Sequence, residues 1–188
     1  MKKLIRGRGF KYLLSFLIMF ILLISMSIQP LVTNLLGEEI LIKTKAYDPR
    51  DLFRGDYIRL NYEINEIDIS KLDKEILDRI DGAPSYIDLG NKKLYVHLTE
   101  KDGDYEVDRV TLEEPKEGIY IEGKYEYNIW DYSKEREIKG IRVDYALDKY
   151  FVPENTGKEL EEKVRAGEAY AKIKVYRGYP LLKEIILK

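Results

Sequence analysis

Residues 55–62 read Gly-Asp-Tyr-Ile-Arg-Leu-Asn-Tyr, and apolar and polar side chains alternate along them. Ile58, Leu60 and Tyr62 share one parity, and the alternation continues to Ile64. Successive side chains of a β-strand point to opposite faces of the sheet, so this pattern predicts a strand with one buried face. The other face would carry Tyr57, Arg59, Asn61 and Glu63. A partner could reach these four outward residues.

The same alternation recurs along much of the chain. It predicts strands near residues 39–46, 94–98, 105–112, 119–130, 138–147, 169–176 and 180–187. Short strands joined by tight turns are typical of a barrel or a sandwich. Capping-box spacings predict two short helices, one over Ser70–Asp81 and one from Thr156 to a stop at Gly167. The expected fold class is therefore mainly β, a barrel or sandwich with one or two short helices.

The N-terminal part has the charge pattern of a membrane anchor. Residues 1–11 carry five basic residues and no acidic one, and residues 12–36 carry no charge. About 20 apolar residues span the hydrocarbon core of a bilayer, and a basic flank stays in the cytoplasm. We expect a cytoplasmic segment 1–11, a transmembrane signal anchor 12–36 in the lipid bilayer and an extracytoplasmic domain 38–188. The alternative is a signal peptide cleaved near Ser27, although the apolar run continues past that site.

Composition excludes several classes of protein. The chain has 188 residues, 34 acidic against 32 basic, and five of the basic ones precede the apolar segment. The remainder is acidic on balance, whereas nucleic-acid binding needs a basic face, so no nucleic-acid partner is expected. The absence of cysteine excludes disulfides, a thiol nucleophile and a cysteine zinc site. One domain of about 150 residues buries enough surface to fold without such links.

The segment before the alternating strand predicts a tight corner. In residues 48–51, Asp-Pro-Arg-Asp, the proline presets the backbone of a type I turn. Gly55 suits a positive φ or a bulge where the strand begins. Asp56 shares the parity of the buried residues and needs a partner, which Arg50 or Arg54 could supply. We expect these groups to lock the corner; the alternative is a surface read by a partner or ligand.

Two blocks of the chain resemble the GDYXXLXY family of bacterial membrane-anchored proteins. The first block is residues 47–62, which contains the motif and its Asp-Pro-Arg-Asp leader, and the second is residues 150–161. The residues that carry the resemblance are Asp48, Pro49, Arg50, Asp51, Arg54, Gly55, Asp56, Tyr57, Leu60, Tyr62, Tyr150, Phe151, Pro153, Glu154 and Gly157. The resemblance implies a membrane location and a multi-pass membrane protein as partner. It implies no reaction.

The residues give little support for a catalytic site. The only histidine, His97, lies on the polar side of a predicted strand, and the chain lacks the spacing of a calcium loop. Residues 49–58 also resemble the strand entry of type I signal peptidases, but no serine lies between Ser27 and Ser70. We therefore predict no catalytic residue, no metal ligand and no cofactor. A hydrolase distantly similar in fold to signal peptidases stays as an alternative.

Sixteen tyrosines raise the possibility of an aromatic binding surface. In the strand over 119–130, Tyr125 and Tyr127 share the parity of the apolar residues and are expected in the core. Tyr120 and Trp130 have the opposite parity, so they join Tyr57 as candidates for surface binding. We expect a non-enzymatic accessory or binding protein for another envelope component. A cell-wall glycan-binding module is the alternative that these aromatic residues favour.

Overall fold

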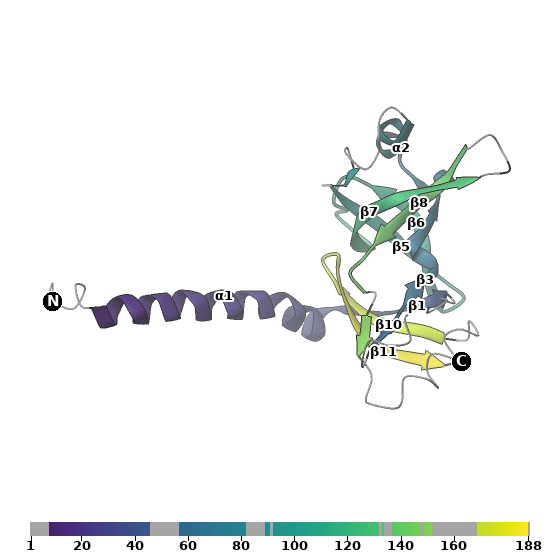
Figure 1. Cartoon of the computed structure of the whole chain (residues 1–188). Coiled ribbons are helices and arrows are strands. Elements are labelled where there is room, and N and C mark those ends of the chain that lie inside the picture. Colours follow the sequence, from purple (N-terminus) through teal and green to yellow (C-terminus); the bar gives the residue numbers. More distant parts are fainter. Residues whose placement is uncertain are drawn as a thin grey trace.

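The computed structural model describes residues 8–45, 57–81, 89–90, 92–131, 133, 137–147, 149–151 and 169–187. Helix α1 (Arg8–Leu36) projects from a β domain that contains the rest of the described chain (Figure 1). Its residues Gly9–Leu36 have a mean hydropathy of 2.2, and no other helix of the described part is long and apolar enough to cross a membrane. Most apolar side chains of α1 are exposed in the protein, which is consistent with a helix that could cross a membrane.

The β domain has short elements. Its strands are β1 (Glu38–Lys45), β2 (Tyr57–Arg59), β3 (Asn61–Tyr62), β4 (Glu66–Asp68), β5 (Lys93–Lys101), β6 (Asp104–Thr111), β7 (Ile119–Asp131), β8 (Glu137–Asp144), β9 (Lys149–Phe151), β10 (Ala169–Tyr176) and β11 (Tyr179–Leu187). Its helical elements are η2 (Glu63–Asn65), η3 (Ile69–Lys71) and α2 (Lys74–Asp81). The fold is mainly β, which confirms the expected class.

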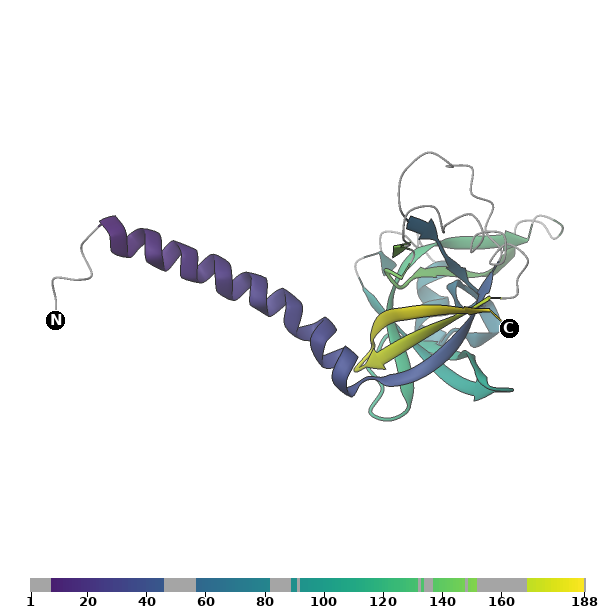
Figure 2. The same ribbon diagram turned by 90° about the horizontal axis from the view of Figure 1, so that it is seen from below.

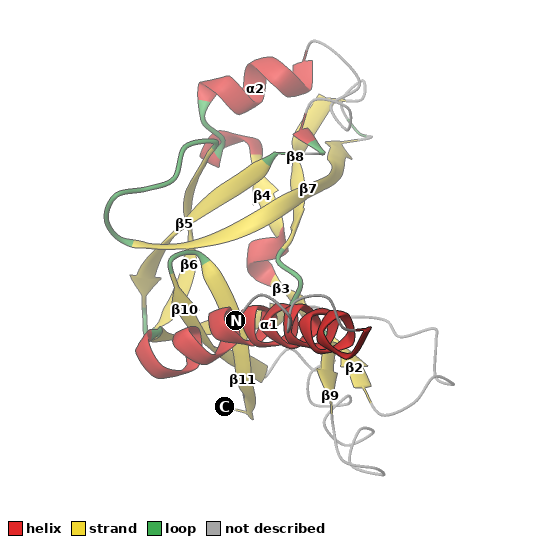
Figure 3. Ribbon diagram, turned by 90° about the vertical axis from the view of Figure 1, so that its left-hand side faces the viewer, coloured by secondary structure: helices red, strands yellow, loops and turns green. Residues whose placement is uncertain are grey.

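The strands form two larger sheets and one small one. The orders are β11-β10-β1-β3, β4-β8-β7-β5-β6 and β2-β9, and every strand pair within them is antiparallel. Figure 3 shows the sheets along the direction of α1, with α2 at the far end of the five-stranded sheet. One cluster of buried residues joins the two larger sheets, for example Ile40 and Ile173 with Val96 and Ile121.

The strand predicted over residues 57–64 is interrupted. Its parity is right, because Leu60, Tyr62 and Ile64 are all buried. The backbone nevertheless breaks at Leu60 and turns into η2 after Tyr62. Asn65 explains the turn: its Oδ1 accepts from the Tyr62 N–H at 2.7 Å, and its Nδ2 donates to the carbonyl of Val143 at 2.8 Å. The Asn65 side-chain amide here makes hydrogen bonds that the backbone of a neighbouring strand would make in a regular sheet.

The first of the two predicted helices is present but begins later than expected. Helix α2 begins at Lys74, later than the Ser70 start, because the N–H groups of Ile76 and Leu77 donate to the carbonyl of Asp73. Ser70 lies in η3, where its own N–H and hydroxyl both donate to Asp68. The helix predicted over residues 156–167 lies outside the described residues.

The end of α1 is bonded to the β domain. Lys174 of β10 donates to the carbonyl of Asn34 at 2.8 Å, and Lys183 of β11 donates to the Asn34 side chain at 2.7 Å. Lysines at a helix C-terminus satisfy its free carbonyls and its negative partial charge. Thr33 is fully buried, and a Cβ on Gly37 would come within 2.4 Å of the Thr33 carbonyl. The last turn of α1 is therefore part of the packed domain.

Candidate functional site

The two sequence blocks that carry the family resemblance meet in space. Strand β2 from the first block pairs with β9 at the start of the second, and Ile58 lies opposite Tyr150 while Tyr57 lies opposite Phe151. Residues 47–56 of the first block and 152–161 of the second lie outside the described part. The locked corner and its Asp56 ion pair therefore remain predictions, as does a binding role for Tyr57.

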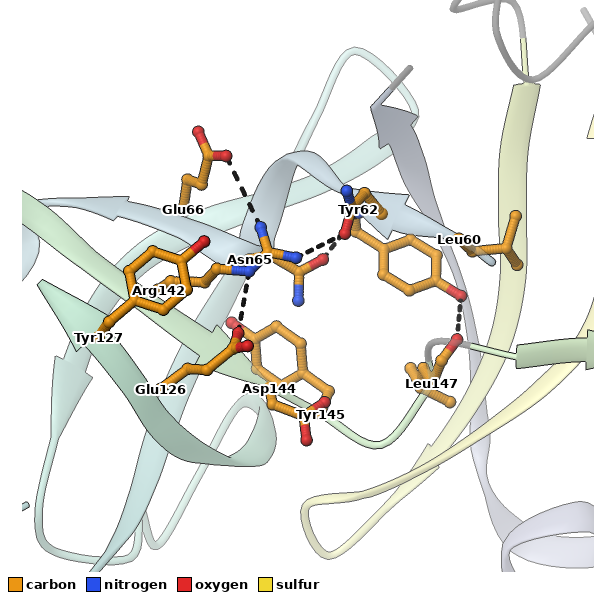
Figure 4. A pocket seen from close by; sticks show the side chains of 11 residues that line it. Leu60, Tyr62, Asn65, Glu66, Glu126, Tyr127, Arg142, Asp144, Tyr145 and Leu147 are labelled. Carbon is orange, nitrogen blue, oxygen red and sulfur yellow. Dashed lines mark hydrogen bonds and ion pairs between the residues drawn. The ribbon is translucent and has the colours of Figure 1, made fainter. Parts of the chain in front are cut away.

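Leu60 and Tyr62 border a pocket of about 490 Å³ between β3, η2, β7 and β8 (Figure 4). The lining residues are Leu60, Asn61, Tyr62, Asn65, Glu66, Glu126, Tyr127, Arg142, Asp144, Tyr145 and Leu147. Most of these side chains are polar. The pocket has the size of a small-molecule or peptide side-chain site, which makes it the candidate functional site.

Arg142 of β8 connects the walls of the pocket. Its Nε donates to Glu126 at 2.9 Å, one Nη donates to Asn61, and the other lies 3.6 Å from a carboxylate oxygen of Glu66. The guanidinium carbon lies 6.0 Å from the centre of the Tyr127 ring, within cation–π range. The strand pairing causes this convergence, because Arg142 lies opposite both Glu66 and Tyr127 in its two neighbouring strands.

A β-bulge in β7 brings Glu126 and Tyr127 to the pocket. Tyr125 pairs with Val143 and Tyr127 pairs with Arg142, so Glu126 is the extra residue. A bulge shifts the alternation of faces by one residue and re-aims side chains, often beside functional sites. Tyr125 is buried as expected, but Tyr127 is 49% exposed. The expectation that Tyr127 packs in the core is wrong for this reason.

Buried hydroxyl and amide groups hold the inner wall. The Tyr62 hydroxyl donates to the carbonyl of Leu147 at 2.8 Å, and the Tyr145 hydroxyl donates to the carbonyl of Ile64 at 2.7 Å. Burial, with a smaller contribution from Asp144, raises the pKa of Tyr145, so this phenol stays a neutral donor. These bonds join β3 and η2 to residues 145–147, which follow β8.

The charged groups of the pocket are acidic on balance. The lining contains three carboxylates, those of Glu66, Glu126 and Asp144, and one arginine. Lys45 also pairs with Glu66, and Asp144 accepts a hydrogen bond from the Ala146 N–H. In the part of the chain that the structure describes, no group of three histidine, cysteine or acidic side chains could hold a metal ion. The arrangement offers carboxylates, an amide, an aromatic face and a guanidinium edge, which suit recognition of a polar ligand.

His97 lies on β5, a strand that contributes nothing to the pocket lining. Its Nε2 lies 3.1 Å from the Thr111 hydroxyl, which itself donates to the carbonyl of Glu113. The histidine is therefore the donor of this bond. Burial, and after it the charge of Arg109, lowers the pKa of His97. It has the contacts of a structural residue between β5 and β6.

The structure changes the set of surface aromatic residues. Trp130 is exposed as expected, but Tyr120 is buried, so the expectation that Tyr120 presents a binding surface is wrong. The β10–β11 turn covers it: Glu122 N–H donates to the Gly178 carbonyl, and a Cβ on Gly178 would lie 2.6 Å from the Tyr120 ring. The Tyr120 hydroxyl donates to Glu114, and burial together with this bond raises the Tyr120 pKa.

Three of the lining residues are recognisable in the sequence, whereas Arg142 and Glu126 are not. The motif contains Leu60 and Tyr62, and its alternation placed Asn61 among the outward residues. Arg142 and Glu126 carried no local signal, because their proximity depends on strand register and on the bulge. Arg142 is one of four charged residues in β8, so its own sequence context did not single it out.

The described chain is a single apolar helix joined to a mainly β domain with a polar pocket. The family model for the GDYXXLXY protein matches residues 19–185, and the chain belongs to this family. No curated protein matches the chain. No solved structure matches it either.

Proposed function

We propose that this chain is a single-pass membrane protein whose extracytoplasmic domain binds another envelope component through the Arg142 pocket. In this proposal residues 1–11 are cytoplasmic, residues 12–36 are an uncleaved anchor in the cell membrane, and 38–188 fold outside. The partner is an integral membrane protein of the multi-pass type that the family resemblance implies. The domain is an accessory subunit with no reaction of its own.

The position of the motif carries the proposal. Leu60 and Tyr62 are buried at the pocket, while Asn61 between them reaches Arg142 from the other side of the chain. Tyr127 is exposed beside these groups and offers an aromatic face. Aromatic and arginine side chains are the usual anchors of protein interfaces. A motif that served only to hold the fold would not require a polar pocket of about 490 Å³ beside it.

Photocrosslinking in native membranes tests the partner. A photoreactive amino acid replaces Tyr127 in the full chain, and the matched control replaces Glu100, which is exposed on β5 outside the pocket. We expect one discrete membrane-protein adduct from position 127, lost when Arg142→Gln is added, and none from position 100. Monomer alone at position 127, or the same adduct from both positions, would overturn the proposal.

The topology has its own test. Protease added to intact cells, in an organism or preparation without an outer-membrane barrier, should digest the chain after Glu38 and leave the basic segment protected. The packing of Thr33 and Asn34 against the β domain fixes the C-terminal end of α1 and holds whether or not the chain is cleaved near Ser27, so the N-terminus of the mature protein decides between the two forms. Full protection of residues 38–188 would refute the orientation. A mature N-terminus near Ser27 would refute the uncleaved anchor.

Glycan binding is the second candidate, and one observation favours it. Tyr127 presents an exposed ring next to Glu126 and Asn61, the combination of a flat aromatic face and polar groups that suits a sugar. Full-length protein in nanodiscs should then bind soluble cell-wall fragments, and Tyr127→Ala should weaken binding more than Tyr12→Ala in α1. Equal binding by both variants would remove this candidate.

A further inference from the structure

The closed end of the β10–β11 hairpin lies at the level where α1 ends. Glu38, two residues after the last residue of α1, pairs with Val175 in the antiparallel β1–β10 ladder. Strand β10 then continues toward α1, so Tyr176 and Arg177 lie level with Gly37 and Leu36. Figures 1 and 2 both show the closed end of this yellow hairpin beside the C-terminal end of α1.

Direct bonds hold the hairpin at this level. Lys174 of β10 and Lys183 of β11 both donate to Asn34 in the last turn of α1. Gly37 lets the chain pass close to the Thr33 carbonyl and to the Cβ of Lys174. Two bonded strands and a tight junction leave the turn little freedom to swing away from the end of the helix. If α1 spans the bilayer, the turn is therefore held at the membrane surface.

The turn has the residues of a membrane interface. Its sequence, residues 176–179, is Tyr-Arg-Gly-Tyr, and the exposed Arg177 lies 5.6 Å from the Tyr176 ring centre. Tyrosine is enriched at the level of lipid headgroups, and arginine binds phosphate through several donors. Among the described residues, no carboxylate pairs with Arg177. Its guanidinium therefore keeps its donors for another acceptor.

Arginine at position 177 is unfavourable for the backbone conformation of the turn. Arg177 has φ 48° and Gly178 has φ 75°, the pattern of a two-residue hairpin turn that favours Asn-Gly. A residue with a Cβ is disfavoured at positive φ, because the Cβ comes too close to a carbonyl oxygen. The inner side of the turn is filled by Tyr120, so packing explains Gly178 and leaves Arg177 unexplained. A contact outside the domain would account for it.

We propose that the turn at residues 176–179 is a second membrane contact, in which Arg177 binds the phosphate of a lipid headgroup and Tyr176 and Tyr179 lie in the interface. The inference rests on the proposed anchoring by α1 and extends it. Together, the helix and the hairpin set the orientation of the β domain on the bilayer. The pocket at Arg142 is then presented at a defined height above the membrane.

Single-cysteine labelling tests the contact, because the natural chain has no cysteine. A fluorophore is placed at Arg177→Cys, at Ser133→Cys in the β7–β8 turn, or at Ser25→Cys in α1. The full chain is reconstituted in nanodiscs that contain lipids with a nitroxide in the headgroup or in the acyl chain. We expect headgroup nitroxides to quench position 177 at least threefold more than position 133, and acyl nitroxides to quench position 25.

The three positions separate the two proposals. Quenching at position 25 with equal quenching at 177 and 133 would overturn the membrane contact and leave the anchor intact. Absence of quenching at position 25 would overturn the anchor and the contact together. A further comparison uses unlabelled protein: Arg177→Gln should lower the melting temperature in discs of anionic lipid relative to the natural chain, while Arg109→Gln on β6 should not. Identical shifts for both variants would refute the role of the Arg177 charge.

Discussion

The hydroxyl of Tyr62 donates a hydrogen bond of 2.8 Å to the carbonyl of Leu147. Tyr62 is the last residue of the first sequence block, and Leu147 lies shortly before β9, where the second block begins. The same two regions pair again through β2 and β9. The described parts of the two blocks are therefore held together in space, and the strength of this connection can be measured.

Removing the Tyr62 hydroxyl tests this unit. Tyr62→Phe leaves a buried carbonyl without this donor, and we expect a loss of about 1–2 kcal/mol in the free energy of unfolding. Tyr127→Phe is the control, because the Tyr127 side chain is largely exposed. Denaturant unfolding of both variants in detergent gives the two values. Equal stability of Tyr62→Phe and the natural chain would mean that the bond contributes nothing to the fold.

The Arg142–Glu126 pair should be coupled, although modestly. The Arg142 side chain is 16% exposed and that of Glu126 is 48% exposed, so solvent screens part of their attraction. A double-mutant cycle with Arg142→Met and Glu126→Gln should give a coupling energy of about 0.5–1 kcal/mol. The exposed Lys101–Glu106 pair, with side chains 62% and 43% exposed, should give a value near zero. Coupling of the same size in both pairs would contradict a special role for Arg142.

Gly140 should tolerate no side chain. An added Cβ would come within 2.1 Å of the Ile67 carbonyl oxygen in the neighbouring strand β4. Backbone cannot yield as a flexible side chain does, so Gly140→Ala should destabilise the domain by about 2–3 kcal/mol. Gly118→Ala meets no atom but has φ 85°, and should cost about 1 kcal/mol. Thermal unfolding ranks the two, and the reverse order would show that β4 is not held against β8 at this point.

His97 should make stability depend on pH. Its folded pKa is lowered from 6.5, so below pH 6.5 the unfolded chain binds a proton that the folded chain resists. Stability should fall as pH drops from 6.5 to the folded pKa and then level off for this group. The difference between the natural chain and His97→Gln, followed from pH 8 to pH 5, isolates the effect from other groups. A constant difference across this range would refute the lowered pKa.

Period-two alternation was enough to locate most strands. Residues 169–176 and 180–187 were predicted almost as β10 and β11 occur, and β10 buries every second residue as the pattern requires. Leu60 and Tyr62 were assigned to the core for the same reason and are buried there. The apolar run of α1 was equally clear, because it depends on composition alone.

The alternating pattern predicted the wrong exposure for two tyrosines of β7. Tyr120 was expected outside and is buried, because a hairpin from the end of the chain covers the second face of β7. Tyr127 was expected inside and is exposed, because the bulge at Glu126 reverses the parity after it. Neither the distant hairpin nor the bulge leaves a local pattern in the residues around these tyrosines.

The sequence by itself determined the family, the apolar helix, the mainly β class and the burial of Leu60 and Tyr62. The family follows from the motif residues and the other properties from composition and the two-residue repeat of a strand, all of which are local. Only the tertiary structure decided that the two motif blocks pair, that Arg142 joins Asn61 to Glu126, and that the β10–β11 turn lies beside the end of α1. Such contacts depend on strand register between distant segments, which the packing of the whole core selects.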